Sequence, residues 1–145
     1  MRRIICIGNR YVAEDAAGPA VYDYLRRLRL PADLELVDGG LAGLDLLRYL
    51  EGAEQVVFVD SVSGYGDSSG VFVLEDKEVA ALAANRYDHS AGLAYLLRVA
   101  PHACAGTLPQ VRLVGVQGAP DQEAIRAAAN LALETVGDGG YEDGS

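Results

Sequence analysis

The sequence predicts an α/β protein: a single-domain, three-layer α/β/α fold around a five-stranded, mainly parallel twisted sheet with one antiparallel edge strand. Short apolar runs rich in Val and Ile alternate with segments of helical spacing, the order typical of parallel βαβ units. The chain has 145 residues, half of them hydrophobic, and 17 glycines suited to tight turns. We expect one domain over residues 1–136, followed by a flexible acidic tail over residues 137–145.

The first two elements follow from hydrophobic spacing. Residues 4–7 (IICI) form a β-branched run typical of a buried parallel strand, which ends at Gly8-Asn9. A helix is expected after Pro19 and should end near Pro31. Its apolar stripe consists of Val21, Tyr24, Leu25 and Leu28.

The middle of the chain predicts strand, helix and strand. Residues 33–38 (DLELVD) alternate apolar and acidic side chains, as in a half-buried strand. Residues 44–50 are expected to form a helix with Leu44, Leu47 and Leu50 facing the sheet. Residues 55–60 (QVVFVD) are apolar up to Asp60, so this strand should be central.

The next connection decides the topology. Residues 61–70 (SVSGYGDSSG) are loop-forming and too few for a parallel crossover, which needs about a dozen residues or more. A strand at residues 71–74 should therefore run antiparallel at an edge. Residues 75–86 predict at most a weak helical turn, and a short helix should carry Leu93, Leu96 and Leu97. A fifth strand at residues 111–116 and a helix from about Pro120 to Val136 complete the fold.

Charge and composition exclude several classes of function. The chain has 21 acids against 12 bases, a formal charge of −9, which repels phosphate backbones and makes nucleic acid an unfavourable partner. No apolar run approaches the ~20 residues of a membrane span. Cys6 and Cys104 have no paired spacing, and the apolar run after Arg3 is short for a signal peptide. We therefore expect a cytoplasmic protein with no membrane partner.

Three chemistry-bearing side chains should meet at one edge of the sheet. Glu14 and Asp15 follow the first strand, Asp60 ends the third, and His89 precedes a helix. Ligands of open α/β sheets bind beyond the carboxyl ends of the strands. Asp15, Asp60 and His89 would form a mixed oxygen and nitrogen site for a divalent cation, able to polarise a carbonyl or activate water. Plain alternatives exist: the acids can cap loops, and His89 can be a satisfied imidazole beside a helix cap.

An ordered set of motifs resembles the hydrogenase maturation endopeptidases. The set spans nearly the whole chain and comprises Gly8-Asn9-x5-Asp15-x2-Gly18, Asp38-Gly39-Gly40 with Gly43 and Leu46, VVFVDSV around Asp60, His89-Ser90 with Gly92-Leu93, and Gly115 to Gln117. The resemblance implies a cytoplasmic protease, aspartyl-type or metal-dependent, that trims the C-terminal extension from the precursor of a nickel-iron hydrogenase large subunit after nickel insertion.

The resemblance also implies roles for individual residues. Asp15, Asp60 and His89 match the family's metal-interacting trio, and the nickel is thought to belong to the substrate. Asp38 is expected at the substrate cleft, with a plain strand-terminating turn as the alternative. Glu14, where the family usually has Asp, is also expected there. The sequence departs from the family pattern at Leu41, where Thr is common, and at Arg10 and Tyr11, which replace more apolar residues. These two are expected to influence which precursor docks.

Two other classes of protein stay open at this point. A receiver-like signalling domain also has an acidic pair after strand one and an aspartate after strand three, which hold magnesium. Such a domain needs a lysine after the fifth strand, where this chain has Gln117-Gly118-Ala119-Pro120. The third possibility is a non-catalytic metal-binding domain that uses the same trio for recognition alone.

Overall fold

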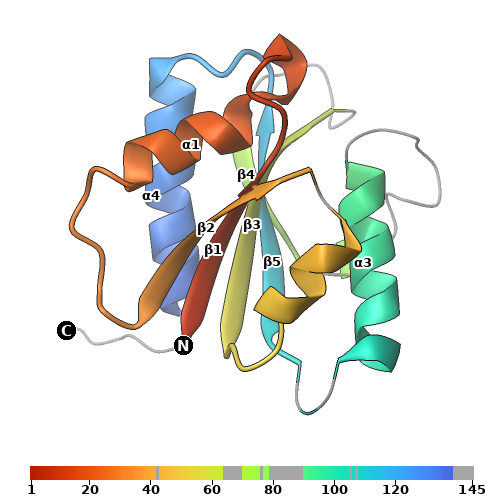
Figure 1. The fold of residues 1–145 in the computed structure, drawn as a ribbon. Helices are drawn as coiled ribbons and strands as arrows, with labels where there is room; N and C mark the ends of the chain where they lie inside the picture. The colour runs from red at the N-terminus through yellow and green to blue at the C-terminus, as the bar shows by residue number, and fades with distance from the viewer. Residues whose placement is uncertain are drawn as a thin grey trace.

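A computed structural model describes residues 1–41, 43–63, 70–75, 77–78, 90–104, 106 and 108–138. The chain forms one sheet with helices on both of its faces (Figure 1). In chain order the elements are β1 (Arg2–Ile7), the 3₁₀ helix η1 (Ala13–Asp15), α1 (Ala17–Leu25), β2 (Leu34–Gly40), the 3₁₀ helix η2 (Leu44–Tyr49), β3 (Gln55–Val62), β4 (Gly70–Glu75), α3 (Ser90–Ala103), β5 (Gln110–Gln117) and α4 (Gln122–Asp138).

The sheet has the strand order β2-β1-β3-β5-β4. β1 pairs in parallel with β2 and β3, and β3 pairs in parallel with β5. β4 lies at the edge and runs antiparallel to β5. The predicted fold class is therefore confirmed, including the antiparallel edge strand inferred from the short connection before it. β3 is central, which explains why residues 56–59 are all buried.

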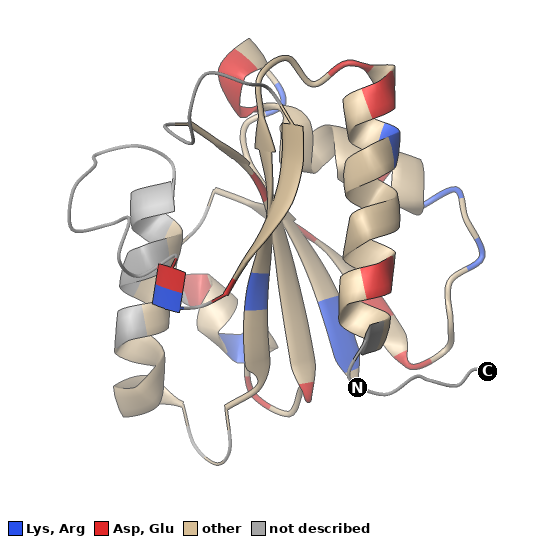
Figure 2. Cartoon of the chain, turned by 180° about the vertical axis from the view of Figure 1, so that it is seen from behind, with Lys and Arg blue, Asp and Glu red and all other residues tan. Residues whose placement is uncertain are grey.

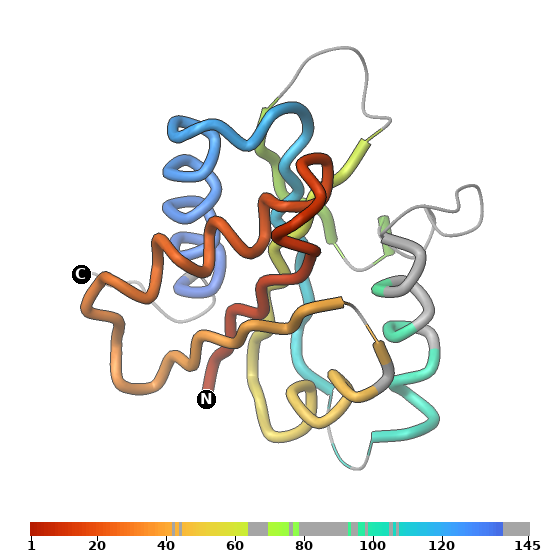
Figure 3. Tube along the Cα trace, turned by 45° about the horizontal axis from the view of Figure 1, so that its top comes forward, coloured from red at the N-terminus to blue at the C-terminus, as the bar shows by residue number. Residues whose placement is uncertain are grey.

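Two apolar clusters lie on opposite faces of the sheet. One contains Phe58 with Leu93 and Leu96 of α3, and the other contains Ile4 with Val21 of α1. The tube view shows α1 and α4 on one side of the strands, and η2 and α3 on the other (Figure 3). The carboxyl ends of β1 and β3 are thus held between two packed layers.

The helix α4 packs on the sheet through small side chains. Ala128, Ala129 and Ala132 have no exposed area and belong to the same cluster as Val114 of β5. Methyl groups let a helix axis approach the strands closely, because longer side chains would need extra space between the layers.

Arg2 ties three segments together at the amino end of β1. Its Nε and Nη2 each donate a 2.9 Å hydrogen bond to the carboxylate of Asp33, just before β2. Its Nη1 donates to the carbonyl of Val136 at 3.2 Å, near the end of α4. A guanidinium at a helix C-terminus satisfies a carbonyl that has no partner within the helix and complements the helix dipole.

The first crossover helix is shorter than its hydrophobic stripe predicts. α1 ends at Leu25 rather than near Pro31, and Leu28 is 41% exposed instead of buried. The backbone N–H of Leu28 bonds to the carbonyl of Leu25 at 3.0 Å, three residues back. This tightening is typical of a helix end, and it directs the chain towards β2 before Leu28 can reach the sheet.

Other boundaries differ in smaller ways. The segment predicted as a helix at 44–50 is the short 3₁₀ helix η2, followed by Leu50. Leu50 is buried and Leu47 partly buried, as predicted, Leu46 is buried as well, and the side chain of Leu44 lies outside the described part of the chain. Six residues are too few to make a regular helix favourable by itself. α3 is longer than expected, and it buries Leu93 and Leu96 as predicted. Most of residues 75–86 and the tail beyond Asp138 lie outside the described residues, so the expected domain boundary at 136 stays a prediction.

Within the described part of the chain, no helix combines the length and the apolar character needed to cross a bilayer.

Candidate active site at the carboxyl ends of β1 and β3

Asp15 is buried within the segment that follows β1. It is the last residue of η1 and is 2% exposed. The backbone N–H of Asn9 donates to the Asp15 carbonyl at 2.9 Å and to its Oδ2 at 3.0 Å. The Asp15 N–H in turn donates to the carbonyl of Val12 at 2.9 Å. The backbone N–H of Asn9 therefore helps to orient this carboxylate.

Two glycines allow η1 and α1 to lie directly against the end of β1. Gly8 has φ of +144°, and a Cβ there would lie 2.3 Å from the Asp15 carbonyl oxygen. A Cβ on Gly18 of α1 would lie 2.0 Å from the carbonyl oxygen of Ile7. Both distances are shorter than any van der Waals contact, so only glycine fits. These contacts place Asp15 at the rim of the sheet.

Asp60 lies inside β3 rather than after it, because the strand continues to Val62. It pairs in register with Gly115 of β5 and is 1% exposed. Its Oδ1 accepts a 2.8 Å hydrogen bond from the backbone N–H of Ser61. The aspartate is therefore part of the ordered sheet, with its carboxylate held next to its own backbone.

The structure brings Asp15 and Asp60 to the same edge of the sheet. The N–H of Ala17, at the start of α1, donates to the Oγ of Ser61 at 3.3 Å. Since Ala17 is two residues beyond Asp15 and Ser61 directly follows Asp60, this bond links the two acidic segments. η1 also contacts β3. The two acidic segments thus lie together at one edge of the sheet, and the meeting of their carboxylates at a metal site stays a prediction.

His89, the third member of the predicted trio, lies outside the described residues, just before α3 begins at Ser90. Within the described ranges, no group of three or more His, Cys, Asp or Glu side chains is placed to hold a metal ion. Asp15 and Asp60 offer carboxylate oxygens, which suit hard or borderline divalent cations. The carboxylates of Asp15 and Asp60 could therefore supply two oxygen ligands to the proposed metal site.

A hollow of about 300 Å³ lies beside the Asp15 loop. Residues from that loop and from the end of β2 line it, including Asn9, Arg10, Asp38 and Leu41. Asp38 is exposed, and its Oδ1 accepts a 3.3 Å hydrogen bond from the N–H of Gly40. Glu14 is also exposed, in η1. The two residues predicted at the substrate cleft, Asp38 and Glu14, are thus both accessible, and Asp38 lines the hollow beside the Asp15 loop.

Arg10 links this groove to α1. Its Nη1 donates to Asp23 at 2.9 Å, and its Nη2 lies 3.9 Å from the Asp38 carboxylate. The hydrogen bond and the negative charge of Asp23 raise the pKa of Arg10 above its ordinary value, and Asp38 adds to this. The positively charged guanidinium of Arg10 therefore lies between two carboxylates, that of Asp23 on α1 and that of Asp38 on β2.

Cys6 contributes no chemistry to this site. It lies in β1 in register with Asp38 and is completely buried. Burial, reinforced by the charges of Asp38 and Asp23, raises the pKa of its thiol well above the ordinary value. Because only the thiolate attacks carbonyls or binds metals, a permanently protonated Cys6 acts as a small core residue.

The sequence matches the family HycI, described as hydrogenase maturation protease, over residues 19–135. The chain belongs to the hydrogenase maturation protease family. The match includes Asp38 and Asp60 and begins after Asp15. The family resemblance seen in the motifs is thereby confirmed, and it favours an endopeptidase over a receiver-like domain.

Two curated relatives support the assignment. The chain is 31% identical over 97 residues to "Hydrogenase 2 maturation protease" of Escherichia coli (strain K12), covering 65% of this chain and 59% of that protein. It is 32% identical over 142 residues to "Hydrogenase expression/formation protein HupM" of Azotobacter chroococcum mcd 1, covering 90% of this chain and 66% of that protein. The chain therefore matches a little under two thirds of the length of these two relatives.

Solved structures of the family share the fold. The hydrogenase maturating endopeptidase HybD from E. coli superposes with a TM-score of 0.82 at 25% identity, covering 96% of this chain and 93% of that one. The solution structure of an endopeptidase from E. coli gives a TM-score of 0.77 at 29% identity, covering 98% and 96%. The three-layer architecture around Asp15 and Asp60 is thus that of the maturation proteases.

Sequence reasoning missed two residues that shape this member of the family. The first is Ser61, whose hydroxyl accepts the hydrogen bond from Ala17. The second is Asp23, whose carboxylate accepts a hydrogen bond from Arg10. The signal for Ser61 in the sequence is its position directly after Asp60, the residue predicted to end the strand. Nothing in the sequence pairs Asp23 with a loop residue 13 positions earlier.

Proposed function

We propose that this chain is an endopeptidase that removes the C-terminal extension from the precursor of a nickel-iron hydrogenase large subunit after nickel insertion. The observation that supports this proposal most is the pair of buried carboxylates, Asp15 beyond β1 and Asp60 in the neighbouring strand β3, in a chain of the maturation protease family. The reaction is hydrolysis: water adds to the carbonyl carbon, and the amine leaves with a proton.

In this proposal Asp15, Asp60 and His89 contact the nickel of the substrate. Carboxylates removed from bulk water interact strongly with a cation, because the surrounding dielectric is low. Asp15 and Asp60 are both nearly inaccessible and fixed by backbone N–H groups, so they keep their geometry before the substrate arrives. Such preorganisation favours recognition of a metal-loaded precursor over an empty one.

Asp38 and Glu14 are proposed to contact the substrate chain at the cleft. Asp38 borders the hollow beside the Asp15 loop, and both residues are exposed. Arg10 and Tyr11 line the same hollow, in keeping with an influence on which precursor docks. The proposed compartment is the cytoplasm, because Cys6 and Cys104 form no disulfide.

The test is incubation of purified protein with nickel-loaded and nickel-free precursor, followed by intact mass measurement. We expect loss of the C-terminal extension from the loaded precursor only. Asp15→Asn and Asp60→Asn should each lower the cleavage rate by about a hundredfold or more, with thermal unfolding close to that of the parent. Asp45→Asn, an exposed acid at the start of η2, is the matched control and should cleave normally.

Two outcomes would contradict the proposal. Equal cleavage of both precursors would remove nickel as the recognition element. Tight binding of the loaded precursor without any cleavage would leave a metal-recognition domain in place of a protease.

A further inference from the structure

A second hollow lies between α1 and α4, on the layer opposite η2 and α3. Its volume is about 410 Å³. The two helices contact one another, and Figures 1 and 3 both show them side by side. Half-buried Tyr24 and Ile125 provide its apolar surface, and the exposed residues Arg27, Gln122 and Arg126 line its outer part.

The two arginines of this hollow, like Arg29, lack the acidic or aromatic partner that the other arginines with described side chains have. Arg2, Arg3, Arg10 and Arg112 each have a carboxylate within 4.0 Å, and Arg26 and Arg48 stack on tyrosines. Within the described residues, Arg27, Arg29 and Arg126 have no acidic partner. Arg27 and Arg126 both line the hollow, whereas Arg29 does not.

This arrangement is unusual for so acidic a chain. With a formal charge of −9, carboxylates are abundant, yet two guanidiniums of this hollow remain unmatched. Figure 2 shows basic residues on α4 and on the segment that follows α1, on the same side of the molecule. Guanidinium groups bind carboxylates through paired hydrogen bonds, and an apolar surface beside them accommodates a neighbouring apolar side chain.

We infer that the hollow between α1 and α4 is a docking site for an acidic segment of the precursor, separate from the place where the peptide bond is cut. The inference rests on the proposed function. In this arrangement Arg27 and Arg126 bind carboxylates of the segment, and an adjacent apolar side chain packs on Tyr24 and Ile125.

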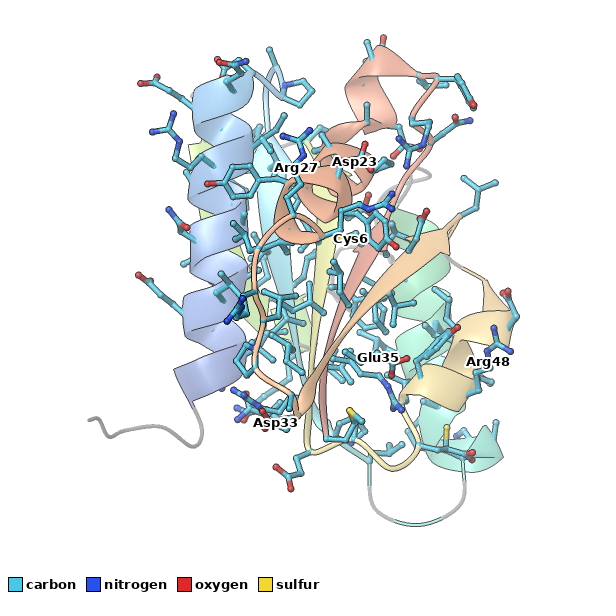
Figure 4. All side chains as sticks on the ribbon, turned by 60° about the vertical axis from the view of Figure 1, so that its left-hand side comes forward. Cys6, Asp23, Arg27, Asp33, Glu35 and Arg48 are labelled. Atoms are coloured by element: carbon cyan, nitrogen blue, oxygen red, sulfur yellow. The ribbon has the colours of Figure 1, made fainter. Side chains whose placement is uncertain are left out.

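The position of the hollow favours the precursor as its occupant. Asp23 lines it and also accepts the 2.9 Å hydrogen bond from Arg10, which lines the hollow beside the Asp15 loop. The Arg10–Asp23 ion pair is therefore the boundary between the two hollows. Figure 4 shows Asp23 of α1 near Arg27, which follows that helix, with Arg48 well away on η2. A substrate bound at the sheet edge can continue across this boundary.

The experiment compares precursor cleavage by the parent with that by Arg27→Gln, Arg126→Gln and the double variant. We expect the double variant to raise KM about tenfold with kcat unchanged, since two exposed ion pairs together contribute that much. Raising the salt from about 50 to about 300 mM should weaken binding to the parent more than binding to the double variant. Arg29→Gln removes the same charge outside the hollow and should change KM less than about twofold.

Further measurements separate the possible failures. Arg27→Lys keeps the charge and should recover part of the lost affinity, which a purely structural role would not predict. If the parent cleaves the precursor and the double variant has the same KM, the docking site alone is overturned. If the parent neither binds nor cleaves the precursor, the proposed function fails and this inference fails with it. If the parent is a dimer and the double variant a monomer, the occupant is a second copy of the chain and the inference is wrong.

Discussion

The backbone N–H of Ala17 donates a 3.3 Å hydrogen bond to the Oγ of Ser61. Ala17 begins α1, and Ser61 follows Asp60 in β3. The bond therefore connects the segment that carries Asp15 to the strand that carries Asp60. We expect it to help set the spacing of the two acidic segments, so we propose that Ser61 acts as a positioning residue.

Replacing Ser61 by Ala leaves the Ala17 N–H without this acceptor. We expect the free energy of unfolding to fall by about 1 kcal/mol, the usual cost of such a bond. The ratio kcat/KM for precursor cleavage should fall as well, because the two acids are less well aligned. Ser61→Thr retains the hydroxyl and should recover activity. Chemical denaturation and cleavage kinetics measure both effects, and an Ala variant equal to the parent in both would contradict the positioning role.

Gly18→Ala should be strongly destabilising. Its Cβ would lie 2.0 Å from the carbonyl oxygen of Ile7, and neither the helix nor the strand can yield without disturbing the core. We expect a loss of about 3 kcal/mol or more in the free energy of unfolding. Gly70→Ala is the matched control, because a Cβ there meets nothing within 4 Å. Guanidinium denaturation of the two variants should separate them clearly, and equal midpoints would refute the close contact.

Enlarging the buried face of α4 should also destabilise the fold. Ala129 is fully buried, so Ala129→Leu must push the helix away from the sheet, at a cost of about 1 to 3 kcal/mol. Ala127 is exposed on the same helix, and Ala127→Leu should change stability by less than about 0.5 kcal/mol. Thermal unfolding of both variants tests this difference. Similar melting temperatures for the pair would mean that the helix packs less closely than described.

The Arg2–Asp33 pair gives stability a defined dependence on pH. Hydrogen bonding to Arg2, followed by the Arg2 charge, lowers the pKa of Asp33 from its ordinary value of 3.8. A lowered folded-state pKa means that the unfolded chain takes up the proton first as the pH falls. The contribution is therefore fully present above the ordinary value and is lost as the pH falls below it through the folded-state pKa.

Asp33→Asn should remove this part of the acid dependence. We expect the parent to lose more stability than the variant as the pH is lowered below about 4, with the difference between them constant at higher pH. Urea unfolding at a series of pH values measures it. Parallel curves for parent and variant across the acid range would show that the pair is not formed in solution.

Most of the sheet could be predicted because its signals are local. The buried strands are short runs of β-branched residues, and the antiparallel edge strand follows from a connection too short for a crossover. The positions of Asp15 and Asp60 follow from the same reasoning, since the carboxyl ends of parallel strands meet at one edge. Their shared location was therefore accessible from the sequence alone.

The errors occurred where tertiary structure overrides a local pattern. Leu28 continues the helical stripe of α1, yet the helix ends at Leu25 because the chain turns towards β2. η2 has the leucine spacing of a helix but only six residues. The contact of Arg10 with Asp23 depends on how a loop folds over a helix, and no sequence period encodes it. Which charged residues from distant segments form pairs can therefore be seen only in the three-dimensional structure.

The close approach of Gly8 and Gly18 to the surrounding backbone divides the segment after β1 into a buried part, which holds Asp15, and an exposed part. The carboxylate of Asp15 accepts a hydrogen bond from the main-chain N–H of Asn9, in the same segment, where Gly8 and Gly18 leave no room for a side chain. The side chains of the exposed part, such as Tyr11 with 90% of its surface exposed, do not take part in these buried contacts. Partner preference can therefore diverge through the outer residues of the segment while the acidic centre keeps its geometry.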